Sequence, residues 1–208
     1  MTILIAVIIL IFSIILHEVA HGYVADLLGD PTARYSGRLT LNPLPHIDPM
    51  GSVIIPGLLA LTHSPFLFGW AKPVPYNPYN LKNQKWGEAM VGFAGPFTNF
   101  IIALGFGLVI RFSGATLGDT LTSAFALAVF SNLSLAILNL IPIPPLDGSK
   151  VLKALLPYQL SQSYGRLEGI SYALGPFGLV AVLLLFIYVF SAPVSQFVYY
   201  LFSLIVGV

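Results

Sequence analysis

Cysteine is absent from the 208-residue sequence. Its absence excludes a disulfide framework and any zinc site built on thiolate ligands. Charged residues are also scarce, because Asp, Glu, Lys and Arg make up 8% of the chain, against about 25% in a typical soluble domain. The formal net charge is only +1, so there is no basic excess to attract nucleic acid. We therefore expect neither a soluble domain nor a nucleic-acid partner.

Apolar residues dominate the chain instead. They make up 57% of it, and the mean hydropathy is +0.88, which indicates an integral membrane protein in contact with the lipid bilayer. The N-terminal stretch "MTILIAVIILIFSIIL" has neither the basic segment nor the small-residue cleavage site of a signal peptide. It is predicted to be a retained transmembrane helix.

A helix that crosses a bilayer needs about 20 largely apolar residues. The sequence predicts such helices over residues 3–28, 88–112, 120–143 and 170–190, with a shorter one over 194–208. The expected fold is an all-α polytopic membrane protein with about five transmembrane helices. We expect one membrane-embedded domain over 1–208, with a core over 1–156 and additional C-terminal helices over 170–208.

Residues 51–69 form a further apolar stretch, but Pro56, Gly57, His63 and Pro65 make a continuous helix unfavourable. We expect a re-entrant segment that dips into the membrane and returns to the same side. Such backbone is tolerated at membrane depth only where protein or a wet cavity surrounds it. The neighbouring loops, rich in Pro, Gly and Asn, leave room for short β-strands on the cytoplasmic side.

The basic residues predict the orientation. If 51–69 is re-entrant, the loops 29–87 and 144–169 share one face and carry eight of the nine Lys and Arg residues, with Arg111 alone opposite. Because cytoplasmic loops are enriched in Lys and Arg, that face is expected to be cytoplasmic, with the N-terminus outside the cytoplasmic membrane of a prokaryotic cell. A fully crossing 51–69 would weaken this bias, and that alternative stays open.

Three ionisable residues, His17, Glu18 and His21, interrupt the first apolar run in the motif "HEVAH". Histidines four residues apart share one face of a helix, so both imidazoles can reach one ion, as in the HExxH zinc hydrolases. Placing an acid at the centre of a membrane helix costs roughly 2.5 kcal/mol or more of insertion free energy. A divalent metal bound at this position would offset the cost of placing three ionisable side chains there. The alternative is a polar patch that has reached the cytoplasmic interface.

A catalytic zinc needs a third protein ligand from elsewhere in the chain. Asp147 is favoured, because it follows an apolar run that prolines 142, 144 and 145 end on an extended backbone. With a re-entrant 51–69, it also reaches the side of the membrane that holds His17 and His21. The alternative for Asp147 is an N-cap for a following helix. The other acids considered were Asp26, Asp30, Asp48, Glu88 and Asp119.

Three segments then carry a family resemblance. "HEVAH", "AGPFTN" at 94–99 and "NLIPIPPLDG" at 139–148 resemble the signature segments of the site-2 protease family of intramembrane zinc metalloproteases. "NPLPHIDPMGS" and "GWAKPVPYNP" resemble connecting segments of its compact prokaryotic branch, which lacks PDZ and CBS domains. The resemblance covers about residues 10–155.

The resemblance implies specific roles. His17, His21 and Asp147 would bind one Zn²⁺ per chain, and Glu18 would be the catalytic base toward a zinc-activated water. Asn139 and Asn99 would bind substrate. The implied activity is hydrolysis of peptide bonds in or near transmembrane segments, as in regulated intramembrane proteolysis. The partner would be a transmembrane-helix protein. We further expect it to unwind locally and to pair with the re-entrant region 51–69 and the loop 70–86 by β-addition; its identity and the oligomeric state are not predicted.

Several alternatives remain at this stage. A metal or small-solute transporter would also place polar residues in spans, although such proteins often show paired halves and this sequence shows none. A catalytically inactive relative and a different membrane zinc protease, with Glu168 as third ligand, are further possibilities. His46 and His63 are read as hydrogen-bonded structural residues in preference to extra ligands, and Asn132 as a structural residue.

Overall fold

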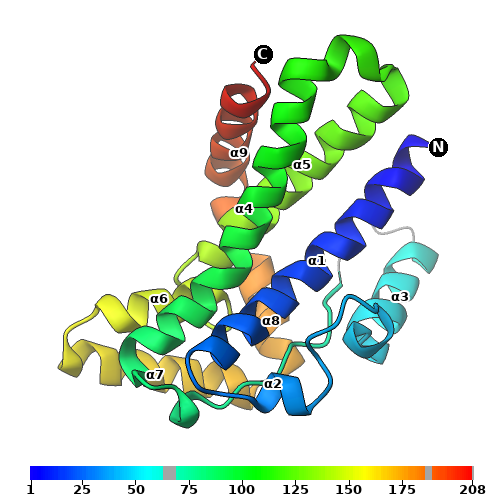
Figure 1. The fold of residues 1–208 in the computed structure, drawn as a ribbon. Helices are drawn as coiled ribbons and strands as arrows, with labels where there is room; N and C mark the ends of the chain where they lie inside the picture. The colour runs from blue at the N-terminus through cyan, green and yellow to red at the C-terminus, as the bar shows by residue number, and fades with distance from the viewer. Residues whose placement is uncertain (63–68, 186–188, 208) are drawn as a thin grey trace.

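The computed structural model describes residues 1–62, 69–185 and 189–207, and it is almost entirely helical (Figure 1). The helices are α1 (Thr2–Leu27), α2 (Thr32–Tyr35), α3 (Ile55–Leu61), α4 (Gln84–Leu117), α5 (Asp119–Leu140), α6 (Asp147–Leu155), α7 (Tyr158–Ala173), α8 (Pro176–Leu185) and α9 (Ser191–Val206). Short 3₁₀ turns cover Leu44–His46 and Pro78–Asn80, and a π-helical turn covers Pro49–Ile54.

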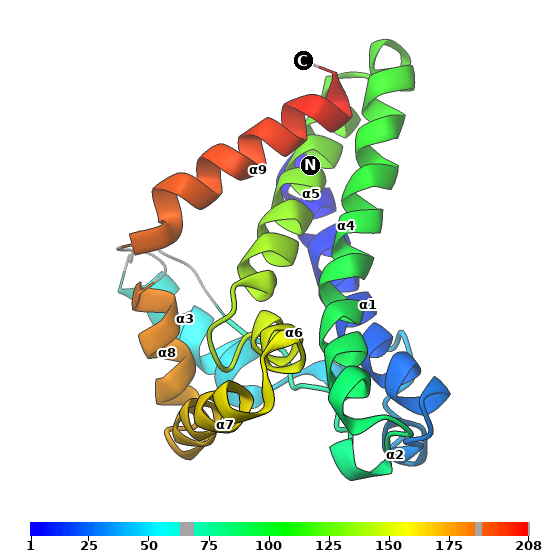
Figure 2. The same ribbon diagram turned by 90° about the vertical axis from the view of Figure 1, so that its left-hand side faces the viewer.

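Three of the described helices are long and apolar enough to cross a membrane. These stretches, Leu4–Leu27, Lys85–Ser113 and Asp119–Leu140, lie in α1, α4 and α5 and confirm the predicted helices over 3–28, 88–112 and 120–143. Helix α4 packs against both α1 and α5, and the three lie side by side in Figures 1 and 2. The chain is therefore a multi-pass, all-α membrane protein.

Helix α9 packs across α4 and α5 at one end of the bundle (Figure 2). The N-terminus, the turn between α4 and α5, and the end of α9 lie at this end, opposite α6 and α7. Arg111 of α4 donates from Nη1 to the carbonyl oxygen of Leu204, 2.9 Å away, close to the C-terminus of α9. A buried cluster joins the three helices, made of Ala103, Ile110, Val129, Leu133, Val198, Ile205 and Val206.

The predicted continuous helix over 170–190 was wrong. The described part of this stretch contains the end of α7 and the whole of α8, separated by a turn at Gly175. Gly175 has φ of +54°, a left-handed conformation, and Pro176, which starts α8, disfavours a helical conformation in the residue before it. Together they break a stretch whose average hydropathy resembles a membrane span.

The segment 51–69 begins in the π-helical turn and continues as α3, with Pro56 in the first turn of that helix. Residues 63–68 lie outside the described residues. They include His63 and Pro65, two of the residues on which the re-entrant prediction was based. Beyond them, the Trp70 N–H donates to the Gly51 carbonyl at 3.1 Å, so the two ends of the segment are neighbours. This contact supports the re-entrant interpretation, which stays a prediction.

The short strands for which the sequence left room are absent from the described residues of the loops. Between Gly69 and Leu81, backbone N–H groups bond one at a time to separate partners instead of forming a ladder. Lys72 donates to the His46 carbonyl, and Val74 donates to the Glu18 carboxylate. Pro73 and Pro75 supply no N–H at all, which removes alternate donors from this stretch.

Asp30, just beyond α1, anchors this loop. Its side chain is fully buried and accepts hydrogen bonds from the Asn77 backbone N–H at 2.6 Å and the Asn80 amide at 2.8 Å. It also accepts from the N–H and hydroxyl of Thr32. Burial raises the pKa of Asp30, but these donors outweigh it and the pKa lies below its ordinary value. The charged carboxylate therefore ties the loop to the end of α1.

Candidate metal centre

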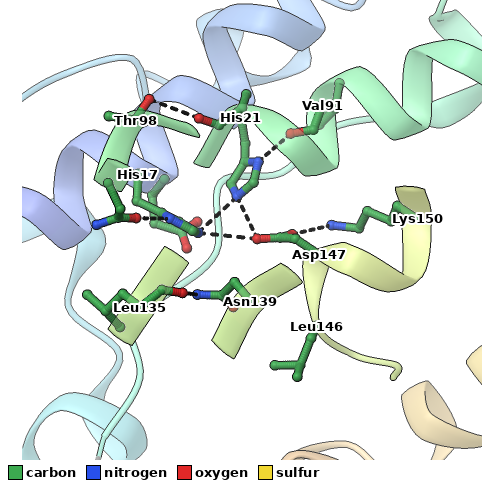
Figure 3. A network of polar contacts seen from close by, with 12 residues as sticks. His17, His21, Val91, Thr98, Leu135, Asn139, Leu146, Asp147 and Lys150 are labelled. Atoms are coloured by element: carbon green, nitrogen blue, oxygen red, sulfur yellow. Dashed lines mark hydrogen bonds and ion pairs between the residues drawn. The ribbon is translucent and has the colours of Figure 1, made fainter. Parts of the chain in front are cut away.

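His17 and His21 project from the same face of α1, one turn apart, as their spacing predicts. Their Nε2 atoms lie 3.1 Å apart, and both residues are buried (Figure 3). The Nδ1 atom of His21 lies 2.6 Å from the carbonyl oxygen of Val91 in α4. Because a carbonyl only accepts, Nδ1 carries the proton, and the Nε2 lone pair of His21 faces the other imidazole.

Asp147 reaches the same point from the beginning of α6 (Figure 3). Its Oδ2 lies 3.3 Å from His17 Nε2 and 3.2 Å from His21 Nε2. The N-cap of α6 is Leu146, and no side chain caps the helix, so the alternative of Asp147 as an N-cap was wrong. A Cβ at Gly148 would lie 2.2 Å from the Leu140 carbonyl oxygen, so only glycine lets α6 start this close to the end of α5.

The carboxylate of Asp147 is held in its charged form. Lys150 places its ammonium 3.0 Å from Oδ1, the oxygen that does not face the imidazoles. Burial raises the pKa of Asp147, but the Lys150 charge and the two imidazoles more than offset it, and the pKa lies well below its ordinary value. Asp147 can therefore bind a cation through Oδ2 while Oδ1 stays paired with Lys150.

The three donor atoms fit a tetrahedral zinc. With zinc bonds of about 2.0–2.1 Å, neighbouring ligand atoms lie roughly 3.3–3.4 Å apart, close to the observed separations of 3.1–3.3 Å. Two imidazoles and one carboxylate also match the donor set of catalytic zinc sites, which leave a fourth position open. Among the described residues, His17, His21 and Asp147 are the one such group close enough to share an ion.

The other candidate residues lie outside this group, most of them with other partners. Asp26 pairs with Arg34, Asp48 caps the π-helical turn through the Gly51 N–H, and Asp119 begins α5 at the far end of the bundle. Glu88 and Glu168 both bond Lys153. His46 Nε2 contacts the Thr40 carbonyl at 2.9 Å, consistent with its structural interpretation.

Gly95 of α4 lies directly against the imidazole pair. A Cβ at this position would lie 2.5 Å from His21 Nε2 and 2.6 Å from His17 Nε2. What sequence reasoning missed is that Gly95, within the segment AGPFTN, packs against the Nε2 edge of both rings.

Glu18 is half-buried and lies between the two histidines in α1. Its Oε2 accepts a hydrogen bond from the backbone N–H of Val74 at 2.9 Å. A Cβ at Gly22, one turn further along α1, would lie 2.8 Å from a Val74 methyl group. Because Gly22 has no side chain, the loop can approach α1 closely enough for Val74 to bond Glu18. Sequence reasoning missed this contact between Val74 and Glu18.

The two predicted substrate-binding asparagines lie in different surroundings. Asn99 is fully buried, with Oδ1 2.5 Å from His17 Nδ1. Asn139 is partly buried, and its amide donates to the Leu135 carbonyl of its own helix at 3.0 Å (Figure 3). Substrate binding by either residue stays a prediction.

Comparisons with known proteins define the class to which this fold and site belong. The family described as Peptidase family M50 matches residues 107–185. YwhC of Bacillus subtilis (strain 168) is 37% identical over 188 residues, which cover 87% of this chain and 79% of that protein. Rip2 of Mycolicibacterium smegmatis is 32% identical over 139 residues (66% of this chain and 52% of Rip2).

MJ0392 of Methanocaldococcus jannaschii is 28% identical over 162 residues, which cover 77% of this chain and 36% of that protein. All three relatives carry the words zinc metalloprotease in their names. No solved structure matches significantly. Together with the apolar helices, these similarities define a membrane metalloprotease. The chain belongs to peptidase family M50, the site-2 protease family.

Proposed function

We propose that this chain is an intramembrane zinc endopeptidase that hydrolyses peptide bonds in or near transmembrane segments of other membrane proteins. The observation that carries the proposal is the convergence of His17 Nε2, His21 Nε2 and Asp147 Oδ2 at 3.1–3.3 Å in a buried position. One Zn²⁺ per chain would occupy this position. Because His17 and His21 belong to a helix that can cross the membrane, the chemistry would take place below the lipid surface.

Glu18 is proposed as the general base. Zinc, when bound, supplies Lewis acidity that activates water and polarises a peptide carbonyl. Glu18 would take up the proton of the attacking water and return it to the leaving nitrogen. The Val74 N–H, which bonds Oε2, would orient the Glu18 carboxylate and leave Oε1 to receive the proton.

A pocket of about 500 Å³ supports an apolar substrate. It lies between α1, α5 and the loops at both ends of segment 51–69, beside the turn of α1 that precedes His17. Ile14, Ile15, Leu135, Leu138 and Trp70 are among its lining residues. An unwound stretch of a transmembrane helix would find apolar walls here, while its opened backbone approaches Glu18.

The proposed orientation places the active site toward the cytoplasm of a prokaryotic cell and the N-terminus outside. Support comes from the position of the proposed metal-binding group in the second half of α1 and at the start of α6, because the chain segments 29–87 and 144–169, which contain most of the basic residues, follow α1 and include α6. Cytoplasmic loops of membrane proteins are enriched in such residues. We propose further that residues 1–208 form a single membrane-embedded domain.

Two variants test the function in proteoliposomes with a panel of single-span substrates. Glu18→Gln should retain zinc but lose roughly 10²–10⁴-fold in cleavage rate, the usual contribution of a general base. His17→Ala should lose both zinc and cleavage. Normal cleavage by Glu18→Gln would contradict the proposal. A transporter would instead show altered metal or solute flux with no cleavage product in either the parent or the variants.

A further inference from the structure

A chain of buried polar side chains runs from Ser13 of α1 through α5 and α4 and ends at His17. Ser13 of α1, Asn132 of α5 and Asn99 of α4 are each at most 1% exposed. The Asn132 amide nitrogen lies 3.0 Å from Ser13 Oγ, and its Oδ1 lies 2.8 Å from the Asn99 amide nitrogen. Asn99 Oδ1 then lies 2.5 Å from His17 Nδ1. The chain thus connects three helices and ends on an imidazole.

The direction of these hydrogen bonds is determined by a backbone group. The Asn132 side chain also contacts the Ala128 carbonyl oxygen of its own helix, at 2.9 Å. Because a carbonyl oxygen only accepts, the Asn132 atom facing it must be the amide nitrogen. The Ser13 hydroxyl donates to the Ile9 carbonyl at 2.8 Å, so it is free to accept from the same nitrogen. Asn132 must therefore turn its oxygen toward Asn99.

The same logic continues to the imidazole. The Asn132 oxygen only accepts, so Asn99 must present its amide nitrogen to it and its oxygen to His17. The Asn99 oxygen in turn accepts from His17 Nδ1, which must carry the proton. His17 Nε2 is left with its lone pair, and it faces His21 Nε2 and Asp147 Oδ2. This is the tautomer that a metal requires at Nε2.

We propose that Asn132 and Asn99 form a positioning relay that sets the tautomer of His17 for metal binding. This inference rests on the proposed function, because it assigns the relay to a metal ligand. His21 obtains the same tautomer directly from the Val91 backbone carbonyl, whereas His17 depends on two side chains. The competing explanation is that Asn132 only joins helices, as asparagine often does within membrane bundles.

Asn132→Leu tests the relay by removing the acceptor that holds Asn99. The Asn99 amide is then free to turn over and present its nitrogen to His17 Nδ1, which favours the tautomer with the proton on Nε2. We expect zinc affinity, measured by competition with a chelator, to fall about 10–100-fold. The matched control is Thr98→Val, because the Thr98 hydroxyl bonds the Ala94 carbonyl of its own helix; its zinc affinity should not change.

A second variant separates tautomer control from packing. Asn99→Asp in the Asn132→Leu background places at position 99 a carboxylate that only accepts hydrogen bonds when ionised. It should restore the proton to His17 Nδ1 and bring zinc affinity back to within about threefold of the parent protein. A helix-joining role of Asn132 predicts no such recovery, because the Asn132 side chain is still missing in the double variant.

The tautomer itself can be read by ¹⁵N NMR of metal-free protein with labelled histidine, under conditions that keep histidine neutral. We expect Nδ1–H at His17 in the parent protein and Nε2–H in Asn132→Leu. The relay is wrong if the parent shows Nε2–H, if folded Asn132→Leu keeps its zinc affinity, or if the double variant stays weak. If Asn132→Leu fails to fold, the parent spectrum still decides. If the parent binds no zinc, the proposed function fails separately.

Discussion

At the scale of single residues, the site depends on glycine, which has no side chain, as much as on its polar side chains. Gly95 lies so close to both imidazoles that one added carbon would fall 2.5–2.6 Å from the two Nε2 atoms. No real Cβ contact is that short, so an alanine would push the rings apart or displace α4. The proposed metal centre therefore depends on α4 as well as on the three proposed ligands.

Gly95→Ala tests this dependence. We expect at least a roughly 100-fold loss of zinc affinity, comparable to severe disruption of the shell around a metal site, together with loss of cleavage. Helical content should be retained, because alanine favours a helix over glycine by about 1 kcal/mol. Gly105→Ala is the matched control in the same helix, since a Cβ there meets nothing within 4 Å. Unchanged zinc binding by Gly95→Ala would show that the rings can move aside freely.

The convergence of His17, His21 and Asp147 could be predicted from the sequence because the signals of these three residues are local. The spacing of His17 and His21 determines a shared helix face, and the prolines before Asp147 mark the end of a span. The roles of Gly95, Val74 and Asn132 could not be predicted in this way. They depend on how α4, α5 and the loop after segment 51–69 are rotated against α1, and no periodicity within one segment encodes that rotation.

At the scale of elements, the loop between Gly69 and Leu81 acts as a support for α1. It is held at one end by contacts with His46 and Gly51 and at the other by Asp30. Between these anchors lies Val74, which bonds Glu18. Loosening the Asp30 anchor should therefore affect Glu18, the proposed base, without removing a proposed metal ligand.

Asp30→Asn tests the anchor. Asparagine has one acceptor oxygen, so at least one buried donor loses its partner, at a cost of about 1–3 kcal/mol in the free energy of unfolding. Cleavage should fall while zinc affinity stays unchanged. Asp119→Asn, at an exposed helix start, serves as the control. If Asp30→Asn is measurably destabilised but cleaves at the parent rate, the Asp30 anchor does not act on Glu18.

The effect of Asp30→Asn on the free energy of unfolding should depend on pH in a defined direction. The pKa of folded Asp30 lies below the ordinary value of 3.8, so its stabilising contribution is complete above that value and is lost as the pH falls through the folded pKa. The difference in stability between parent and Asp30→Asn should therefore be constant near neutral pH and shrink under acid conditions. Thermal unfolding in detergent over a pH series measures it.

Hydropathy predicted the three long helices well, because length and apolar content suffice to identify them. It failed over 170–190, where an equally apolar stretch is divided at Gly175 and Pro176. Average hydropathy takes no account of backbone conformation, so it does not detect a helix break at a left-handed glycine followed by proline. The sequence also left room for short strands in the loops, but Pro73 and Pro75 deprive this backbone of hydrogen-bond donors.

At the scale of the whole molecule, the cysteine-free sequence offers a direct test of the proposed orientation. Single cysteines can be introduced at Tyr35, which is 84% exposed in α2, and at exposed Thr120 in the first turn of α5. In intact cells, a membrane-impermeant maleimide should label Thr120→Cys but label Tyr35→Cys only after permeabilisation. The reverse pattern would invert the orientation.

Arg111 deserves a different interpretation in the folded molecule from the one that its sequence position suggests. It is the one basic residue outside the two loops used to assign orientation, yet its guanidinium bonds Leu204 near the C-terminus of α9. A cation there compensates the partial negative charge of the helix end. Arg111, which looks like an exception to the charge asymmetry, thus has a structural partner at the end of α9, and its position does not count against the proposed orientation.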